Sequence, residues 1–426
     1  MSDLNFKKRR FPIYLSVIIF VSVIILCCVK NKEPSNYVQP DTVDNASTAI
    51  LSKEKTAKEH VFHEGEMRGV WIPYFNLSSG SGNMTEKEFK KHFDNIIKTS
   101  KENGINTLFV HVRSHCDAVY PSDIFPFSDI FTVNGSAPDY DPLEYMITAA
   151  HTAGLEFHAW INPFRVLSET DKNSLDINSP CYGWIHDNDP QNDRFLIEYD
   201  NGLYLNPAAK GARALIINGV RELVENYNID GVHFDDYFYM FTESDYDRED
   251  YLDYVNSLGD LSQPLDLEQW RCTNVNVLIS GVYAVIKNAD GRILFGISPQ
   301  ANIKNDLESG ADVYSWCSRY GYVDYIAPQV YFNSENSILT FEDSVEEWKN
   351  IITNDDIKLY TGLALYKAGS TEDDGTWLSS DSIISDQIEY SRKAETDGFI
   401  LYSWEYLCSD MTAAEVANMK EIIDEA

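Results

Sequence analysis

The 426-residue sequence lacks the short motifs that identify several large classes of enzyme. It has no G-x-G-x-x-G or G-x-x-x-x-G-K segment, so neither a dinucleotide fold nor a phosphate-binding loop is indicated. It has no G-x-S-x-G elbow, which argues against a serine nucleophile of the α/β-hydrolase kind. No flavin or haem motif is present either, and we therefore expect an activity that needs no cofactor.

Cysteine is sparse and forms no C-x-x-C pair, so neither a zinc site nor a dithiol redox motif is predicted. Two of the seven cysteines, Cys27 and Cys28, lie in an apolar run near the N-terminus. The other five are scattered along the chain: Cys116, Cys181, Cys272, Cys317 and Cys408. Their odd number and wide spacing favour buried free thiols.

Basic residues are also scarce, because 34 Lys and Arg stand against 67 Asp and Glu, for a net charge of −33. A surface this negative repels phosphate backbones, so nucleic acid is not an expected partner. An anionic glycan would be repelled at long range as well, unless its binding cleft were locally basic.

The first 30 residues are predicted to be an N-terminal membrane anchor or a lipoprotein signal. The basic cluster Lys7–Arg10 precedes 19 uncharged residues, Phe11–Val29. As a helix this run spans roughly 28 Å, which is enough to cross a bilayer core. A cleaved signal peptide would normally have a shorter apolar region, whereas acylation of Cys27 or Cys28 is an open alternative. The basic flank places the rest of the chain on the extracytoplasmic face of the cell membrane.

The remainder divides into two parts by composition. Residues 31–64 are polar, contain prolines and show no sustained apolar period, which predicts a flexible linker. Residues 65–426 alternate short apolar runs with amphipathic segments, a pattern typical of parallel strands joined by crossover helices. We interpret this part as a single catalytic domain.

Eight strands are predicted in this domain. They are Arg68–Phe75, Asn106–Arg113, Leu155–Asn162, Gly231–Asp236, Ile293–Ser298, Tyr325–Phe332, Lys358–Leu365 and Gly398–Trp404. Eight strands in regular alternation with helices indicate the α/β class and a closed (β/α)8 TIM barrel. A doubly wound sheet usually has fewer strands and a glycine-rich phosphate turn.

Helix signals occur between the strands. Thr85 to Glu88 forms a capping box, and Asp141-Pro142 supplies an N-cap followed by proline at the first helical position. Other helices are predicted over Pro207–Tyr227, Trp270–Asn288, Phe341–Thr353, Ser380–Thr396 and Thr412–Glu425. The least regular segment is Ala311–Tyr320.

Two connections are long, Pro163–Leu205 after strand three and Tyr237–Trp270 after strand four. In a barrel both begin at the C-terminal face, where active sites lie. Long ordered loops are usually binding walls or lids, although a surface insertion without function is the alternative.

Alternate residues of a barrel strand point into the interior, and on four of the predicted strands polar residues occupy these alternate positions. The pairs and triplets that share a face are His111 with Arg113, His158 with Trp160 and Asn162, His233 with Asp235, and Gln329 with Tyr331. A single polar residue of this kind usually satisfies a backbone hydrogen bond. Repetition on four strands instead indicates a site at the C-terminal ends.

Four carboxylates are expected at the mouth of the barrel: Asp117, Asp235, Asp236 and Glu405. Cleavage of a glycosidic bond typically needs two carboxyl groups, one as acid and one as nucleophile or base. Asp235 is the best placed, with His233 two residues deeper to support it, and Asp236 and Glu405 compete for the second role.

Two other functions remain open at this point. His233-x-Asp235-Asp236, together with His111 and His158, contains residue types that bind zinc, so a divalent-metal-dependent polysaccharide hydrolase or deacetylase is one alternative. A glycan-binding barrel without catalysis is the other. Chelator sensitivity separates the first from a glycosidase, and binding without turnover would identify the second.

Several longer motifs resemble one known family. They are Glu66-Met-Arg-Gly-Val-Trp-Ile72, Asn106-Thr-Leu-Phe-Val-His-Val-Arg113, Asp117-Ala-Val-Tyr-Pro-Ser122, His151 to Arg165, Asp230-Gly-Val-His-Phe-Asp-Asp-Tyr-Phe-Tyr239, Phe295-Gly-Ile-Ser-Pro299 and Ala327-Pro-Gln-Val-Tyr331. In this order they resemble the glycosyl-hydrolase-like family ten, from residue 66 to the last strand. The resemblance implies a cell-envelope barrel hydrolase that cleaves peptidoglycan glycan strands. One departure, Gln300-Ala-Asn302, replaces the family's usual turn after strand five.

The strand-four motif also resembles part of the chitinase-type motif, in which the substrate's acetamido group acts as nucleophile. Tyr237 stands where that group has its acid Glu, so Asp235 or Asp236 would have to serve as the acid. The sequence therefore leaves a substrate-assisted route open.

Our prediction is a glycoside hydrolase acting on peptidoglycan or a related cell-wall polysaccharide, with Asp235, Asp236 and Glu405 as catalytic residues and no metal. Residues predicted to bind the glycan are Arg113, Asp117, Trp160, Asn162, Arg165, His233, Gln329, Tyr331 and Trp404. We expect Tyr74 to stack on a sugar face together with Trp160, Tyr331 and Trp404.

Overall fold

A computed structural model describes residues 60–61, 63, 65–78, 84–132, 136–259 and 263–424, which belong to the compact unit Ala57–Ala426. The predicted anchor (1–30) and nearly all of the predicted linker (31–64) lie outside the described residues. The described part of the chain contains no helix with the length and hydropathy of a membrane span.

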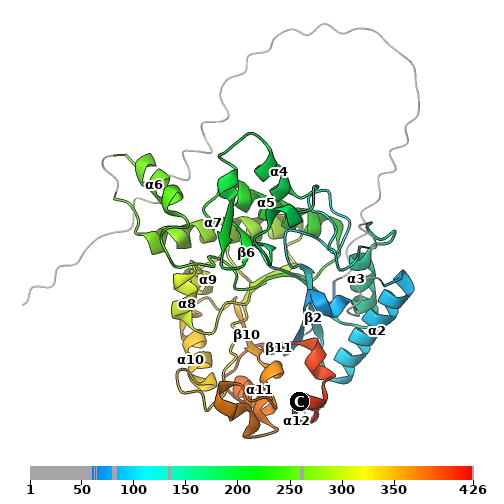
Figure 1. Cartoon of the computed structure of the whole chain (residues 1–426). Coiled ribbons are helices and arrows are strands. Elements are labelled where there is room, and N and C mark those ends of the chain that lie inside the picture. Colours follow the sequence, from blue (N-terminus) through cyan, green and yellow to red (C-terminus); the bar gives the residue numbers. More distant parts are fainter. Residues whose placement is uncertain are drawn as a thin grey trace, which may run out of the picture. The chain divides into compact units, whose positions relative to one another are not determined.

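Eight parallel strands form a closed barrel (Figure 1). In chain order they are β1 (Met67–Ile72), β2 (Thr107–Arg113), β3 (Glu156–Ile161), β7 (Gly231–Phe234), β8 (Leu294–Ile297), β9 (Tyr325–Ile326), β10 (Lys358–Leu363) and β11 (Gly398–Leu401). Each strand pairs with its neighbour in this order, and β11 pairs with β1 to close the ring. The predicted (β/α)8 barrel is therefore confirmed. Seven of the eight strands end earlier than predicted, because the chain leaves the ladder to form the mouth of the barrel, whereas β2 ends at Arg113 as predicted.

Helices cover the outside of the barrel. They include α2 (Glu86–Glu102), α3 (Pro142–Thr152), α5 (Lys210–Asn226), α7 (Leu267–Ala289), α8 (Ile303–Glu308), α9 (Val313–Ser318), α10 (Phe341–Ile351), α11 (Ile383–Lys393) and α12 (Ala413–Asp424). The predicted capping box begins α2, since the Glu88 backbone N–H donates to Thr85 Oγ1 and the Thr85 backbone N–H donates to Glu88 Oε2. Asp141 caps α3 by accepting from the backbone N–H groups of Leu143 and Glu144. The irregular segment 311–320 contains the short helix α9.

The connection after β3 contains its own small sheet (Figure 1, green). Its antiparallel strands β4 (Arg165–Leu167), β6 (Gly202–Leu205) and β5 (Leu196–Tyr199) lie in that spatial order. The short helix α4 (Pro180–His186) lies between β4 and β5 in the chain. The connection after β7 contains α6 (Arg248–Ser257).

The barrel interior is filled by a small aromatic cluster and by a chain of buried hydrogen bonds. Trp71 Nε1–H donates to His233 Nε2 at 3.1 Å, so Nδ1 of His233 carries the proton and donates to Tyr325 Oη at 3.0 Å. Tyr325 can then donate to Nδ1 of His158, also at 3.0 Å. Burial lowers the pKa of His233 well below its usual value, which keeps this ring neutral. Both histidines therefore belong to the buried core of the barrel, and Nε2 of His158 lies 3.5 Å from Glu156 Oε2.

Asp230 supports the opposite, N-terminal end of the barrel. It immediately precedes β7, is fully buried, and its Oδ2 accepts hydrogen bonds of 2.8 Å from the Phe157 backbone N–H and from His151 Nε2. Residues at this end of a barrel usually serve stability. The family motif that contains Asp230 is thus partly structural.

Replacing Asp230 by Ala is expected to lower the free energy of unfolding by about 3 kcal/mol, because buried donors lose their acceptor. Urea unfolding followed by circular dichroism measures this change. The exposed Asp193 supplies a control, and Asp193→Ala should change stability by less than about 0.5 kcal/mol. Equal stabilities of the two variants would contradict the assignment.

Candidate active site

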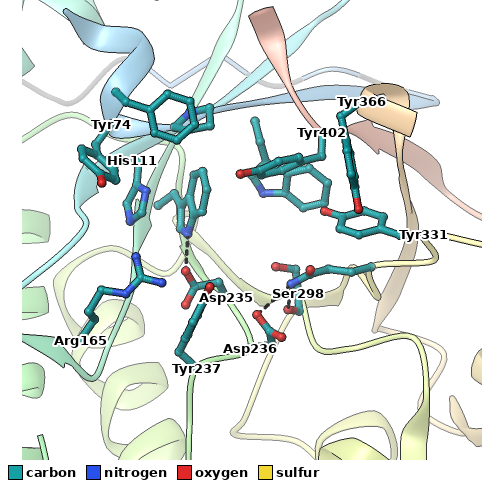
Figure 2. A pocket seen from close by; sticks show the side chains of 15 residues that line it. Tyr74, His111, Arg165, Asp235, Asp236, Tyr237, Ser298, Tyr331, Tyr366 and Tyr402 are labelled. Atoms are coloured by element: carbon teal, nitrogen blue, oxygen red, sulfur yellow. Dashed lines mark hydrogen bonds between the residues drawn. The ribbon is translucent and has the colours of Figure 1, made fainter. Parts of the chain in front are cut away.

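A cavity of about 260 Å³ lies at the C-terminal ends of the strands, where barrel enzymes place their active sites (Figure 2). It is lined by Trp71, Pro73, Tyr74, Phe75, His111, Trp160, Arg165, Asp235, Asp236, Tyr237, Ser298, Gln329, Tyr331, Tyr366 and Tyr402. These residues come from strands of the barrel or from the segments that follow them. The cavity therefore depends on closure of the whole barrel.

Asp235 follows directly after β7 and is 4% exposed. Its Oδ2 accepts hydrogen bonds from Trp160 Nε1 at 3.1 Å and from Asn162 Nδ2 at 3.2 Å. Within the described residues, Oδ1 has no hydrogen-bond partner of normal geometry. Burial and the neighbouring Asp236 raise the pKa of Asp235 to about 8, although Arg165 and Trp160 oppose the shift. Asp235 is therefore mostly protonated at neutral pH.

Asp236 is held differently from its neighbour. Gln329 Nε2 donates to Asp236 Oδ1 at 3.0 Å and to the Ser298 backbone carbonyl at 3.1 Å. Burial raises the pKa of Asp236, while the Gln329 hydrogen bond and the positive Arg165 lower it. Asp235 is buried and Asp236 is half-buried, and the two have different partners. Two such acids can take different protonation states, which is the condition for separate acid and base roles.

Arg165 supplies positive charge to this pair. It begins β4, and its backbone N–H donates to Asn162 Oδ1 at 2.9 Å, which fixes the chain where β3 ends. Its guanidinium lies 4.3 Å from the centre of the Tyr237 ring. Among the described residues that line the cavity, it is the one Arg or Lys. Arg165 therefore sets one positive charge against the two carboxyl groups of the cavity.

Aromatic rings form two walls of the cavity, and Figure 2 shows them on opposite sides of the carboxyl pair. On one side, the rings of Tyr331, Tyr366 and Tyr402 lie 5.7 to 6.0 Å apart between centres. On the other, His111 stacks on Trp160 at 3.9 Å and 12°. Such walls with a few polar groups are typical of small-molecule and sugar sites.

The structure brings many of the residues predicted from sequence to this cavity. Lining it are Asp235, Asp236, Trp160, Arg165, Gln329, Tyr331 and Tyr74. Asn162 contacts the site through its hydrogen bond to Asp235. Their catalytic and binding roles remain predictions. Sequence reasoning missed Tyr366 and Tyr402, although Tyr366 directly follows the predicted strand Lys358–Leu365 and Tyr402 lies near the end of the predicted strand Gly398–Trp404.

Glu405 and Trp404 are not brought to the cavity. They lie in a short 3₁₀ helix (Trp404–Leu407), where the chain has already turned away from β11. Glu405 Oε2 accepts a hydrogen bond of 3.1 Å from Asn76 Nδ2. Trp404 is buried with its ring edge against His92. Neither residue lines the cavity, so Asp236 is the second carboxyl beside Asp235 among the described residues that do.

The prediction that Arg113 shares the interior face with His111 is wrong. The β2–β3 register shifts between His111 and Arg113, so that Arg113 pairs with Ile161. A shift of one residue moves a side chain to the other face of a strand. Arg113 is fully buried, with its guanidinium 3.8 Å from the centre of the Phe125 ring.

Two further predicted residues lie beside the cavity rather than in it. Asp117 lines a neighbouring cavity of about 580 Å³, and its Oδ1 accepts from the His115 backbone N–H at 3.1 Å. The two cavities share Tyr74 in their walls. His233 contacts Trp71, Ser298 and Tyr325 instead of supporting Asp235.

The residues proposed for a metal do not converge. His158 and His233 are engaged with Tyr325, and His111 is stacked on Trp160. In the part of the chain that the structure describes, no group of three or more His, Cys, Asp or Glu is arranged to hold a metal ion.

Replacing Trp160 by Phe is expected to raise the pKa of Asp235 further, because the indole N–H lowers it by stabilising the carboxylate. The lost hydrogen bond is worth about 1–2 kcal/mol. Carbon-13 NMR of labelled Asp carboxyl groups measures the titration. Trp184→Phe, in α4 and outside the cavity lining, is the matched control. An unchanged Asp235 titration in Trp160→Phe would exclude this contact as a determinant.

A search of solved structures gives fold neighbours among glycosidases. The PgaB (BpsB) glycoside hydrolase domain from Bordetella bronchiseptica aligns with a TM-score of 0.56 and 13% identity, covering 83% of this chain and 99% of that domain. This likeness concerns the fold alone.

Sequence relatives extend the comparison. Glycosyl hydrolase YngK of Bacillus subtilis is 32% identical over 350 residues, covering 78% of this chain but 66% of the relative's length. Glycosyl hydrolase DigH of Escherichia coli is 27% identical over 451 residues, covering 98% of this chain and 99% of the relative. The family and these relatives support a glycosidase. The model of the glycosyl hydrolase-like 10 family matches residues 66–379, and the chain belongs to that family.

Proposed function

We propose that this protein cleaves glycosidic bonds in peptidoglycan or a related cell-wall polysaccharide by carboxyl acid/base chemistry. The observation that carries the proposal is the adjacent pair of the buried Asp235 and the half-buried Asp236 at the mouth of the barrel, between two aromatic walls. A pair of acids held in different environments is the recurring requirement of glycoside hydrolysis. The substrate class rests on the family resemblance of the sequence.

Asp235 has the properties of the general acid. It is protonated at neutral pH because its pKa is about 8, and its Oδ1 has no normal hydrogen-bond partner among the described residues. It can therefore give its proton to the departing glycosidic oxygen. The carboxylate that remains is stabilised by Trp160, Asn162 and the charge of Arg165.

Asp236 is then the second carboxyl. Gln329 and Arg165 favour its ionised form, which suits a nucleophile, a base that activates water, or a group that orients the substrate's acetamido nucleophile. Tyr237 stands beside this pair with its ring under the Arg165 guanidinium. We assign its hydroxyl to substrate positioning.

The site of action is proposed to be the cell envelope. Support comes from the basic cluster and the 19-residue apolar run of the first 30 residues, which predict membrane attachment with the barrel outside. Protease added to intact spheroplasts should degrade the barrel. Protection from that protease would contradict an extracytoplasmic location.

The decisive experiment gives the full chain two substrates, denuded peptidoglycan glycan strands and intact sacculi, and identifies products by mass spectrometry. The wild type, Asp235→Asn and the exposed control Asp355→Asn are compared with and without chelator. We expect glycan fragments from the wild type and the control only, with no effect of chelator.

Other outcomes would redirect the assignment. Release abolished by chelator and unaffected by Asp235→Asn would favour the metal-dependent alternative. Binding to glycan without any release would favour a non-catalytic barrel, which is consistent with Tyr237 at the position where chitinase-type enzymes have their acid.

A further inference from the structure

Two cysteines far apart in the sequence meet in the fold. Cys116 lies in the segment after β2, and Cys181 lies in α4, 65 residues later. Their Sγ atoms are 3.5 Å apart, with the Cys181 thiol donating to the Cys116 sulfur. Both are free thiols and both are buried.

Their location is the wall of the 580 Å³ cavity beside the proposed active site. Cys116 lines this cavity together with Asp117 and with Ser179, the residue that caps α4. Cys181 is fully buried and does not line the cavity. A reagent in the cavity therefore reaches Cys116 first.

The surroundings give the two sulfurs different reactivity. The hydrogen bond from Cys181 and the positive charge of Arg113 lower the pKa of the Cys116 thiol, against burial and Asp117. The same hydrogen bond, together with burial, raises the pKa of Cys181. Since the thiolate is the nucleophile in disulfide exchange, Cys116 is suited to attack and Cys181 to resolve.

We propose that Cys116 and Cys181 form a reversible disulfide that links α4 to the segment after β2 and stabilises this wall of the 580 Å³ cavity. Closing the sulfurs from 3.5 Å to bonding distance needs a movement of about 1.5 Å. Side-chain rotation and small backbone adjustments supply movements of this size.

The oxidant is a disulfide, either a small molecule such as oxidised glutathione or a protein dithiol oxidase. The Cys116 thiolate attacks one donor sulfur and expels one donor thiolate, which takes up a proton. Cys181 loses its proton to solvent and attacks Cys116 Sγ, and this second step expels the other half of the donor. Two protein thiols and one donor disulfide thus become one protein disulfide and two donor thiols.

The test treats the purified full chain with oxidised glutathione, blocks remaining thiols and maps tryptic peptides by mass spectrometry. Trypsin cuts after Arg165 and Lys172, so the two cysteines leave on separate peptides unless they are cross-linked. We expect the cross-linked pair in the wild type and in Cys317→Ser, whose cysteine lies in α9, but not in Cys116→Ser. Cys181→Ser should instead accumulate glutathione on Cys116.

Thermal unfolding supplies a second readout. Oxidation should raise the Tm of the wild type by roughly 5 °C, because the cross-link closes a long loop in the unfolded chain, and should not change that of Cys116→Ser. If a variant fails to fold, a titration of the wild type with glutathione mixtures still decides the question. The proposal is overturned if both wild-type thiols stay open to alkylation after oxidation, or if Cys116 holds glutathione without resolution.

Discussion

Asp235→Asn is expected to lower kcat for glycan cleavage by about 10³-fold, because an amide cannot donate the proton that the leaving oxygen needs. Substrate affinity should change little, since the amide oxygen can still accept from Trp160 and Asn162. Initial rates on denuded glycan strands measure both parameters. A loss confined to KM would show that Asp235 binds substrate without acting as the acid.

The same substitution is expected to stabilise the fold at neutral pH. The carboxyl has a pKa of about 8 in the folded chain and about 3.9 when unfolded, so between these values the folded state binds one more proton. Stability contributed by this group is therefore present below about pH 4 and is lost as pH rises to about 8. Between about pH 4 and pH 7 the wild type loses about 4 kcal/mol of its free energy of unfolding through this group. This loss is the upper limit of the stabilisation expected for Asp235→Asn at pH 7.

Urea unfolding at pH 4 and at pH 7 measures this linkage. The wild type and Asp235→Asn should have nearly the same free energy of unfolding at pH 4. At pH 7 the free energy of unfolding should be larger for the variant. Asp355→Asn, which replaces an exposed carboxyl, should track the wild type at both values. A variant that is less stable than the wild type at pH 7 would mean that Asp235 is ionised in the folded protein.

Arg165→Met is expected to move the whole pH–activity profile to higher pH. The guanidinium lowers the pKa of both Asp235 and Asp236, so its removal raises both. The acid limb, set by ionisation of Asp236, and the alkaline limb, set by deprotonation of Asp235, should shift in the same direction. On the acid side of the optimum, activity should fall roughly tenfold to a hundredfold.

Two matched variants separate charge from shape in this prediction. Arg165→Lys keeps the positive charge and should restore most of the profile, although it loses the planar contact with Tyr237. Arg292→Met removes an exposed arginine whose partner is Asp290, and the profile should stay in place. A profile that keeps its limbs in Arg165→Met would show that Arg165 acts on substrate binding instead.

Local features of the sequence were sufficient for the fold. The apolar runs of the strands, the capping box at Thr85 and the cap at Asp141 act over a few residues, so each can be interpreted without knowing its neighbours. Eight such strands alternating with helices leave few arrangements other than a closed barrel. Asp235 and Asp236 follow the end of β7 directly, so their place at the mouth also follows from the strand pattern.

Predictions that depended on exact geometry were less successful. Parity assigned Arg113 to the interior, but a register shift in β2 turned it outward. Glu405 was expected at the mouth, yet the chain turns into a 3₁₀ helix before reaching it and carries the side chain to Asn76. Neither a bulge nor the direction of a turn leaves a clear pattern in the local sequence.

The sequence by itself therefore determined the barrel, the family and the place of Asp235 and Asp236 at the end of the fourth strand, because these depend on periodicity and on short motifs. Only the tertiary structure decided the walls of the cavity, the raised pKa of Asp235 and the contact between Cys116 and Cys181. Burial and proximity arise when segments far apart in the chain pack together. The pKa of a carboxyl group depends on its burial and on the charges near it. Both depend on the tertiary packing, so the pKa of Asp235 does not follow from the order of residues alone.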